Sequence, residues 1–228
     1  MLRLVLFDLD GTLADTAPDI TTAANRALAE IGRGPLPLER VRECVSSGSR
    51  PILHLGLTPA EQKDESLLTQ LSQRLFAHYA ADPVSATRLF AGLDSLLQNL
   101  ATRRIIWGVV SNKPESLAQA TLAGLSPAPM PSCLIGGDTL PRQKPDPLPL
   151  LEACRRCGVA PENTLYVGDA RVDVLAARAA SIPVAVAGFG YAPEPAIVAT
   201  WAPDYYADNV ASLEQILIGL SEFDPAAA

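Results

Sequence analysis

The sequence predicts an α/β fold, a mostly parallel sheet with flanking helices and an all-helical segment inserted after the first strand. From residue 91 onward, short apolar strands alternate with helical segments, which is the pattern of βαβ units. Between Asp15 and Asp82 no strand pattern appears, and apolar residues recur at helical spacing. We therefore expect a core of residues 1–14 and 83–228, and a helical insert of residues 15–82.

The composition favours a globular protein with a small-molecule partner. The 228 residues are 48% hydrophobic and carry a net charge of −7, so we expect neither nucleic acid nor an anionic membrane surface as a partner. An anionic substrate would have to meet local cations. The apolar start is broken by Arg3 and Asp8 and is too short for a signal-peptide core, so a cytoplasmic location is expected.

The cysteines and histidines give no sign of a metal centre. Cys44 and Cys133 stand alone, and the pair Cys154 and Cys157 has no second pair that would complete a zinc site. We interpret that pair as packing on one helical face. His54 and His78 lack ligand-type spacing and are expected to be ordinary packing or surface residues.

The inserted segment begins with a helix for which Thr16 is the expected N-cap and Asp19 the acidic residue of a capping box. Gly32 is expected to end that helix. Further helices are predicted over Leu38–Cys44, Pro51–Leu55 and Glu61–Tyr79.

The core is predicted to contain five strands. They cover Leu2–Phe7, Ile105–Val110, Cys133–Ile135, Thr164–Val167 and Pro183–Val186. The helices between them are expected over Leu93–Leu100, Glu115–Leu122, Pro147–Cys157 and Val172–Ala180. The small-residue tail Pro225–Ala228 is expected to fray.

Two carboxylates follow the first strand, where ligands of open α/β sheets bind. On an extended chain Asp8 and Asp10 leave the backbone on the same face, and two like charges that close need a cation or a shared proton. A hard ion such as Mg²⁺ would suit them. The alternative is an Asp-Gly turn with solvated acids.

Ser111 and Asn112 follow the second core strand, and Pro114 opens the next helix. Ser111 and nearby backbone N–H groups are suited to hold a phosphoryl oxygen, helped by the dipole of that helix. The alternative is an ordinary helix cap.

Three further charged residues lie in loops that follow or precede core elements. Lys144 stands before two prolines that stiffen its backbone, which suggests a placed charge, although a solvated lysine is the alternative. Asp169 and Asp173 lie one helical turn apart and can face one crevice, or they are an N-cap and a first-turn acid.

Together these residues predict a phosphoryl-transfer site. Asp8 would be the nucleophile, Asp10 a proton shuttle and Asp169 a further ligand of Mg²⁺. Ser111 and Lys144 would neutralise phosphoryl oxygens.

Four segments resemble, in order, the four motifs of the haloacid dehalogenase-like phosphatase superfamily. They are Asp8–Thr12, Ser111–Lys113, Lys144–Pro145 and Gly168–Asp169 with Asp173. Within it the chain is similar to the phosphoglycolate phosphatase group through Thr16–Asp19, Gly136–Asp138 and Phe189–Tyr191. It also resembles the N-acetylmuramate 6-phosphate phosphatases through Arg88–Phe90 and Ile106–Pro114. The resemblance implies a Rossmann-like core and an inserted helical cap.

The resemblance further implies an aspartyl-phosphate formed on Asp8, with Asp10 protonating the leaving alcohol and then activating water. It implies Mg²⁺ bound by Asp8, the backbone carbonyl of Asp10, and Asp169, with Asp173 supporting the metal or Lys144. The substrate would be a small phosphomonoester, with 2-phosphoglycolate as first expectation. N-acetylmuramate 6-phosphate or another sugar phosphate is the alternative.

Substrate choice is expected in the cap, where Ser46–Arg50 forms a polar loop. Gly48 and Arg50 there, with Ser111, Asn112 and Lys144 from the core, are the expected substrate-binding residues. Arg50 could bind a carboxylate through its forked guanidinium, or it could be a solvated residue. Both candidate substrates carry a carboxylate, so Arg50 does not separate them.

Other classes fit less well. A non-catalytic phospho-receiver has no use for Asp10 as a proton shuttle or for a helical lid. A dehalogenase on this fold needs no phosphate-neutralising Mg²⁺, whereas a phosphomutase retains both acids and is excluded less firmly. The sequence does not predict the oligomeric state.

Overall fold

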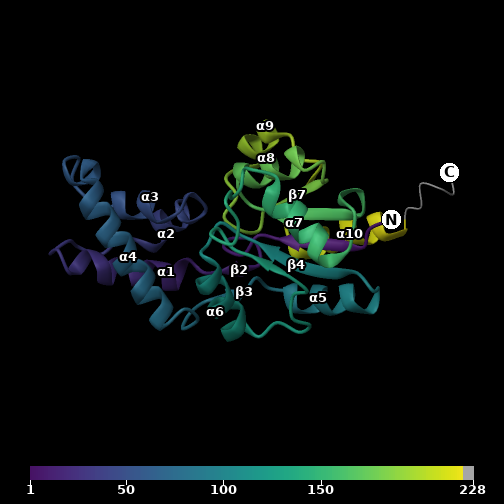
Figure 1. Cartoon of the computed structure of the whole chain (residues 1–228), viewed down its shortest axis with the longest axis horizontal. Helices are drawn as coiled ribbons and strands as arrows, with labels where there is room; N and C mark the ends of the chain where they lie inside the picture. Colours follow the sequence, from purple (N-terminus) through teal and green to yellow (C-terminus); the bar gives the residue numbers. More distant parts are fainter. Residues whose placement is uncertain (223–228) are drawn as a thin grey trace.

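The computed structural model describes residues 1–222 and has a six-stranded, all-parallel sheet at its centre (Figure 1). The strand order is β5-β4-β1-β6-β7-β8. These strands are β1 (Leu4–Phe7), β4 (Ile106–Val110), β5 (Leu134–Ile135), β6 (Thr164–Gly168), β7 (Val184–Ala187) and β8 (Tyr205–Ala207). The predicted α/β class with a mostly parallel sheet is confirmed.

Helices cover both faces of the sheet, which explains why β1 is apolar throughout. Leu97 of α5 (Leu93–Thr102) and Leu213 of α10 (Val210–Glu222) pack on one face, together with α6 (Glu115–Leu125). On the other face lie Leu150 of α7 (Leu148–Cys157) and Val174 of α8 (Arg171–Ala179), together with α9 (Pro195–Trp201). A strand buried on both faces reads as a continuous hydrophobic run.

The helices between Asp15 and Arg88 lie to one side of the sheet layers (Figure 1). They are α1 (Ala17–Ala29), α2 (Leu38–Arg42), α3 (Ser49–His54) and α4 (Glu65–Ala81). α1 packs along α4, and Leu28, Leu53 and Leu68 belong to a hydrophobic cluster separate from the two clusters on the sheet. We call this helical unit the cap.

The chain enters and leaves the cap through two short antiparallel strands, β2 (Ala14–Asp15) and β3 (Arg88–Leu89). Asp19 at the start of α1 ties the two crossings together, because its carboxylate accepts hydrogen bonds from the backbone N–H groups of Ala86 and Thr87. The Thr87 hydroxyl donates to the same carboxylate. The predicted capping box is therefore wrong, since Asp19 bonds across the connection and Thr16 makes no cap hydrogen bond.

Several elements differ from the prediction. β2, β3 and β8 were not predicted because two or three residues are too few to show an alternating pattern. α9 and α10 were not predicted either. The predicted helix Glu61–Tyr79 is interrupted at Asp64. The Asp64 side chain accepts a hydrogen bond from the Leu67 N–H and caps the start of α4.

Cys133, Cys154 and Cys157 pack in the core and Cys44 packs in the cap, with one correction to the prediction. Cys133 does not stand alone, because its sulfur lies 3.3 Å from that of Cys157. Cys154 is buried beside the Thr164 hydroxyl. His54 and His78 belong to the cap, and the His78 ring contacts Glu30.

No helix within residues 1–222 is long and apolar enough to cross a membrane. The expected fraying of Pro225–Ala228 lies outside the described residues.

Candidate active site

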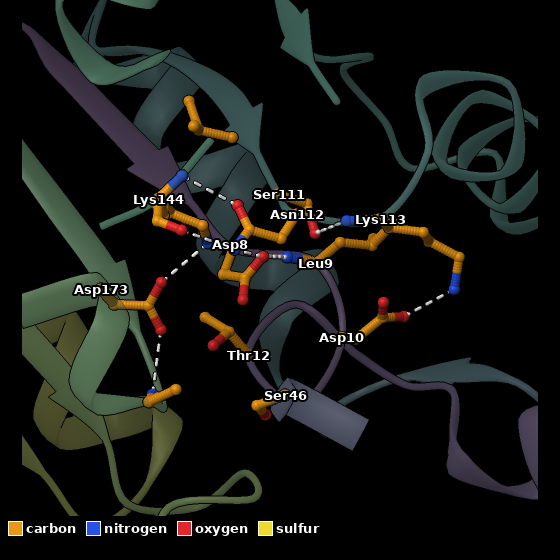
Figure 2. A network of polar contacts seen from close by, with 12 residues as sticks. Asp8, Leu9, Asp10, Thr12, Ser46, Ser111, Asn112, Lys113, Lys144 and Asp173 are labelled. Carbon is orange, nitrogen blue, oxygen red and sulfur yellow. Dashed lines mark hydrogen bonds and ion pairs between the residues drawn. The ribbon is translucent and has the colours of Figure 1, made fainter. Parts of the chain in front are cut away.

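Functional side chains gather where the parallel strands end. Asp8 follows β1, Ser111 follows β4, and Asp169 follows β6. Lys144 comes from the long connection between β5 and α7 and joins them (Figure 2). Because parallel strands end at the same edge, residues distant in the sequence become neighbours there.

Lys144 is the central cation of this group. Its Nζ lies 3.1 Å from Asp8 Oδ1 and 2.7 Å from Asp173 Oδ1, and it donates to the Tyr166 hydroxyl at 2.7 Å. Burial lowers the pKa of Lys144, but the two carboxylates raise it by more, so the pKa lies above its ordinary value. Lys144 is therefore positively charged at neutral pH.

The backbone of Lys144 is held by Asn112. The Asn112 side-chain amide donates to the Lys144 carbonyl at 2.9 Å and accepts from the Lys144 N–H at 3.0 Å (Figure 2). The structure thus gives the Asn112 amide a positioning role toward Lys144, while Asn112 also lines the neighbouring cavity.

Asp173 positions its neighbours. Its Oδ2 accepts the backbone N–H groups of Asp169 and Ala170, and its Oδ1 accepts from Lys144 and Tyr166. A side chain at Gly168 would collide with Asp173, since a Cβ there would lie 2.4 Å from the Asp173 carboxyl carbon. Both carboxylate oxygens of Asp173 are thus occupied by protein donors.

Asp8, Asp169 and Asp173 form a buried acidic cluster, in which one carboxylate oxygen from each residue lies within 4.8 Å of the other two. Burial raises the pKa of Asp8 to about 6, and burial also raises the pKa of Asp169 well above its ordinary value. Lys144 balances only part of this negative charge. A divalent cation that prefers oxygen ligands would fit here. Asp8 and Asp169 would be its ligands, because both oxygens of Asp173 already accept hydrogen bonds from the protein.

Asp169 is further fixed by two hydroxyl groups. Thr12 Oγ1 donates to Asp169 Oδ1 at 2.8 Å, and Ser46 Oγ from the cap donates to Oδ2 at 2.9 Å. Gly11 is required beside them, because its φ of +80° and the contacts of a Cβ with Tyr191 and Asp169 exclude a side chain.

Asp10 lies outside the acidic cluster. β1 ends at Phe7, so the alternation that would place Asp8 and Asp10 on one face does not continue. Instead Asp10 Oδ1 accepts from Lys113 Nζ at 2.8 Å and from the Thr16 hydroxyl at 2.6 Å. The expectation of a cation shared by the two side chains is corrected, because Asp10 has an ion pair of its own.

Lys113 is buried between Asp10 and Tyr79 of α4. Its Nζ donates to the Tyr79 hydroxyl at 3.0 Å and lies 4.1 Å from the centre of the Tyr79 ring. Burial lowers the pKa of Lys113, but Asp10 and Tyr79 together raise it by more, so the pKa lies above its ordinary value. A charged lysine therefore joins the core to the cap.

Two backbone N–H groups near the start of the helix after Ser111 already have protein acceptors. The first N–H group of α6, from Glu115, donates to the Asp138 carboxylate at 2.7 Å. The Ser111 N–H donates to the Ile135 carbonyl. The Ser111 hydroxyl remains beside Asp8 and on the cavity lining as the group that can meet a phosphoryl oxygen.

A cavity of about 120 Å³ lies between the core and the cap. The core contributes Asp8, Asp10, Ser111, Asn112, Lys113, Pro114 and Leu117. The cap contributes Ile20, Val45, Ser46, Gly48, Ser49, Ile52, Leu75, Phe76 and Tyr79. Gly48 thus lies on the lining as expected. The structure does not bring Arg50 to it, because that guanidinium pairs with Glu65 within the cap.

The sequence did not predict active-site contacts for Lys113, Thr12, Thr16 or Tyr79, and it placed Ser46 only within the polar loop of the cap. Lys113 and Thr12 lie within two of the four motif segments, so the sequence could have indicated that they belong to the site. Ser46 and Tyr79 come from the cap, and their contacts with the core arise only from tertiary packing.

Comparison with known proteins agrees with this geometry. The family model of haloacid dehalogenase-like hydrolases matches residues 5–187. A phosphoglycolate phosphatase of Xylella fastidiosa strain 9a5c is 42% identical over 202 residues, covering 89% of this chain and 87% of that protein. The N-acetylmuramic acid 6-phosphate phosphatase of Pseudomonas aeruginosa PAO1 is 34% identical, with 95% of each chain covered.

Among solved structures, a protein described as a predicted phosphoglycolate phosphatase from Haemophilus somnus 129pt superposes with a TM-score of 0.84. Its sequence is 27% identical, and the match covers 95% of this chain and 98% of that one. The resemblance noted in the four motifs is confirmed, as is the prediction of a phosphoric monoester hydrolase. This chain belongs to the haloacid dehalogenase-like hydrolase family.

Proposed function

We propose that this protein is a Mg²⁺-dependent phosphomonoesterase that hydrolyses a small phosphorylated carboxylate, 2-phosphoglycolate, through an aspartyl-phosphate on Asp8. The observation that carries the proposal is the placement of Asp8 between two differently charged groups. On one side are Lys144 and the acids Asp169 and Asp173, and on the other the Asp10–Lys113 pair.

In the first step, a carboxylate oxygen of Asp8 attacks phosphorus while the ester bond to the alcohol breaks. Asp10 gives a proton to the leaving oxygen. In the second step Asp10 takes a proton from water, whose oxygen attacks phosphorus and releases inorganic phosphate and the free Asp8 carboxylate. The hydrogen bonds from Lys113 and Thr16 both reach Asp10 Oδ1, which leaves Oδ2 for these proton transfers.

The Ser111 hydroxyl on the cavity lining would bind a phosphoryl oxygen, and the charge of Lys144 beside Asp8 would offset the negative charge that develops in the transition state. Asp8, Asp169 and the backbone carbonyl of Asp10 would hold Mg²⁺. The ion would neutralise the phosphate beside the negatively charged nucleophile. The raised pKa values of Asp8 and Asp169 support this, because buried carboxylates in excess of their cations call for a further positive charge.

The cavity supports a small substrate. Apolar side chains line it on the cap side, among them Ile52, Leu75 and Phe76, and its volume of about 120 Å³ suits a two-carbon acid better than a substituted sugar. N-acetylmuramate 6-phosphate remains the second candidate, because a relative bearing that name matches nearly the whole chain.

Phosphate release from a panel of phosphomonoesters tests the proposal. We expect the highest kcat/KM for 2-phosphoglycolate, ahead of N-acetylmuramate 6-phosphate and hexose phosphates. EDTA should abolish turnover and added Mg²⁺ should restore it. Full activity in EDTA would contradict the metal requirement, and a single labelling event without turnover would indicate a phospho-receiver instead.

A further inference from the structure

We propose that Lys113 is the residue that selects substrates with a carboxylate close to the phosphate ester, in place of Arg50. The inference rests on the proposed phosphatase function. It adds a residue that determines specificity and predicts which leaving groups that residue favours. It concerns the end of the cavity next to Asp10, where the core and α4 of the cap meet.

The first observation is the distribution of charge. Of all lysine and arginine side chains within residues 1–222, Lys113 is the one on the cavity lining. Arg50 is half exposed and paired with Glu65 at 2.8 Å. A second anionic group on a bound phosphomonoester would therefore meet Lys113.

The second observation is that Lys113 has a donor to spare. An ammonium group carries three N–H donors, and within the described chain Nζ donates to Asp10 and to the Tyr79 hydroxyl. The Tyr79 hydroxyl is itself placed by the Thr121 hydroxyl of α6, 3.1 Å away. The ammonium is thus held at the cavity with one N–H available for a ligand.

The third observation is distance. A group that protonates a leaving oxygen lies within hydrogen-bond reach of it, and Lys113 Nζ lies 2.8 Å from Asp10 Oδ1. Because the proton is transferred through Oδ2 of the same carboxylate, the ammonium lies within about 8 Å of the ester oxygen of a bound substrate. In 2-phosphoglycolate one methylene separates that oxygen from the carboxylate, so the carboxylate can lie between the two and point toward Nζ.

The rule distinguishes the two candidate substrates. The carboxylate of N-acetylmuramate 6-phosphate belongs to the lactyl ether on the sugar ring, many bonds from the phosphate ester. For it to reach Lys113 with the ester oxygen at Asp10, the substituted sugar ring would have to fit between these two residues in a cavity of about 120 Å³. Lys113 therefore favours phosphate esters of short 2-hydroxy acids.

The test compares 2-phosphoglycolate with ethyl phosphate, which lacks the carboxylate. In the full-length Lys113→Met variant, we expect kcat/KM for 2-phosphoglycolate to fall about 10- to 100-fold more than kcat/KM for ethyl phosphate, mainly through KM. Lys113→Arg should recover part of this preference. Arg50→Met and the exposed-lysine control Lys63→Met should leave the ratio between the two substrates unchanged.

Each contrary result has a definite meaning. Equal losses on both substrates would overturn the proposal, because Lys113 would then act only on Asp10. Loss of the ratio in Arg50→Met would also overturn it. Absence of phosphate release from 2-phosphoglycolate by the wild type would instead contradict the proposed function, before any variant is compared.

A substrate series on the wild-type enzyme keeps the proposal testable if Lys113→Met does not fold. Phosphorylated 3-hydroxypropionate and 4-hydroxybutyrate move the carboxylate one and two methylenes farther from the ester. We expect kcat/KM to fall with each methylene. Equal efficiency across the series, or across ethyl phosphate and 2-phosphoglycolate, would overturn the proposal.

Discussion

The two walls of the cavity are built in different ways. On the core wall, the acids of the lining are paired with buried lysines: Asp10 with Lys113, and Asp8 with Lys144, which is not itself on the lining. The cap wall is mostly apolar, and its polar contacts with the charged groups of the core include Ser46 on Asp169 and Tyr79 on Lys113. The core wall thus holds the reacting groups in place before a substrate arrives. The cap wall determines the shape of the cavity and contacts the charged groups of the core through single hydrogen bonds.

This difference predicts an unequal response to mutation. Changes on the core wall should affect the chemical step by orders of magnitude, and changes at the cap contacts should have effects of a few fold.

The largest effect is expected for Asp8→Asn, which removes the nucleophile. Turnover should fall by about 10⁴-fold or more, because no neighbouring group can form the covalent intermediate in its place. Steady-state phosphate release measures this, with the exposed acid Asp94→Asn as the matched control. If Asp8→Asn kept activity comparable to that control, the core wall would not contain the reacting group.

Asp10→Asn should have a smaller effect that depends on the leaving group. Without a proton donor we expect kcat to fall about 10²- to 10⁴-fold for 2-phosphoglycolate, whose alkoxide leaves poorly. The loss should be much smaller for p-nitrophenyl phosphate, because its phenolate needs no protonation. Comparing kcat for the two substrates provides the measurement, and equal losses would remove the proton-transfer role.

The strongest elements of the sequence analysis were those set by local patterns. The apolar run before Asp8 predicted a buried strand, and the acids and the hydroxyl that follow β1, β4 and β6 lie at one edge of the sheet, as the pattern predicted. Because all strands of the sheet are parallel, any residue that directly follows a strand lies at this same edge.

The side-chain partners could not be predicted in the same way. Thr16 has the sequence position of an N-cap, yet its hydroxyl bonds to Asp10, because tertiary packing brings a charged acceptor within 2.6 Å. Arg50 stands in a polar loop, but Glu65 on α4 lies closer than the cavity. β8 is only three residues long, and a segment that short has no distinctive periodicity.

A third prediction concerns stability in the absence of metal. Since burial raises the pKa of Asp8 to about 6 from 3.8, the folded state binds the proton more tightly than the unfolded state. The free energy of unfolding should therefore fall as pH rises from about 4 to about 6, and stay lowered above that. At pH 7.5 in EDTA, Asp8→Asn should unfold with a free energy higher than wild type by on the order of 3 kcal/mol.

Urea denaturation at pH 7.5 and pH 4.5 checks this prediction. The advantage of Asp8→Asn should shrink at pH 4.5, where the wild-type carboxyl is protonated in the folded state. A variant that is less stable than wild type at both pH values would show that the ion pair with Lys144 outweighs the cost of burying the charge.

The smallest effect is expected at the cap contact, in Tyr79→Phe. The ring and its packing against Lys113 remain, but the hydroxyl that accepts from Nζ is lost. We expect kcat/KM to change by a few fold and the free energy of unfolding to fall by about 1 kcal/mol. Enzyme kinetics and urea denaturation measure both quantities. A loss as large as that of Asp10→Asn would abolish the distinction between the two walls.

The most direct test of the central claim is to trap the covalent intermediate. The wild-type enzyme with Mg²⁺ would be mixed with 2-phosphoglycolate, quenched in acid within milliseconds, digested and analysed by mass spectrometry. The account predicts a phosphoryl group on the peptide that contains Asp8, at the Asp8 side chain, and its absence in Asp8→Asn. Rapid phosphate release with no labelled peptide, or a label on a residue other than Asp8, would contradict it.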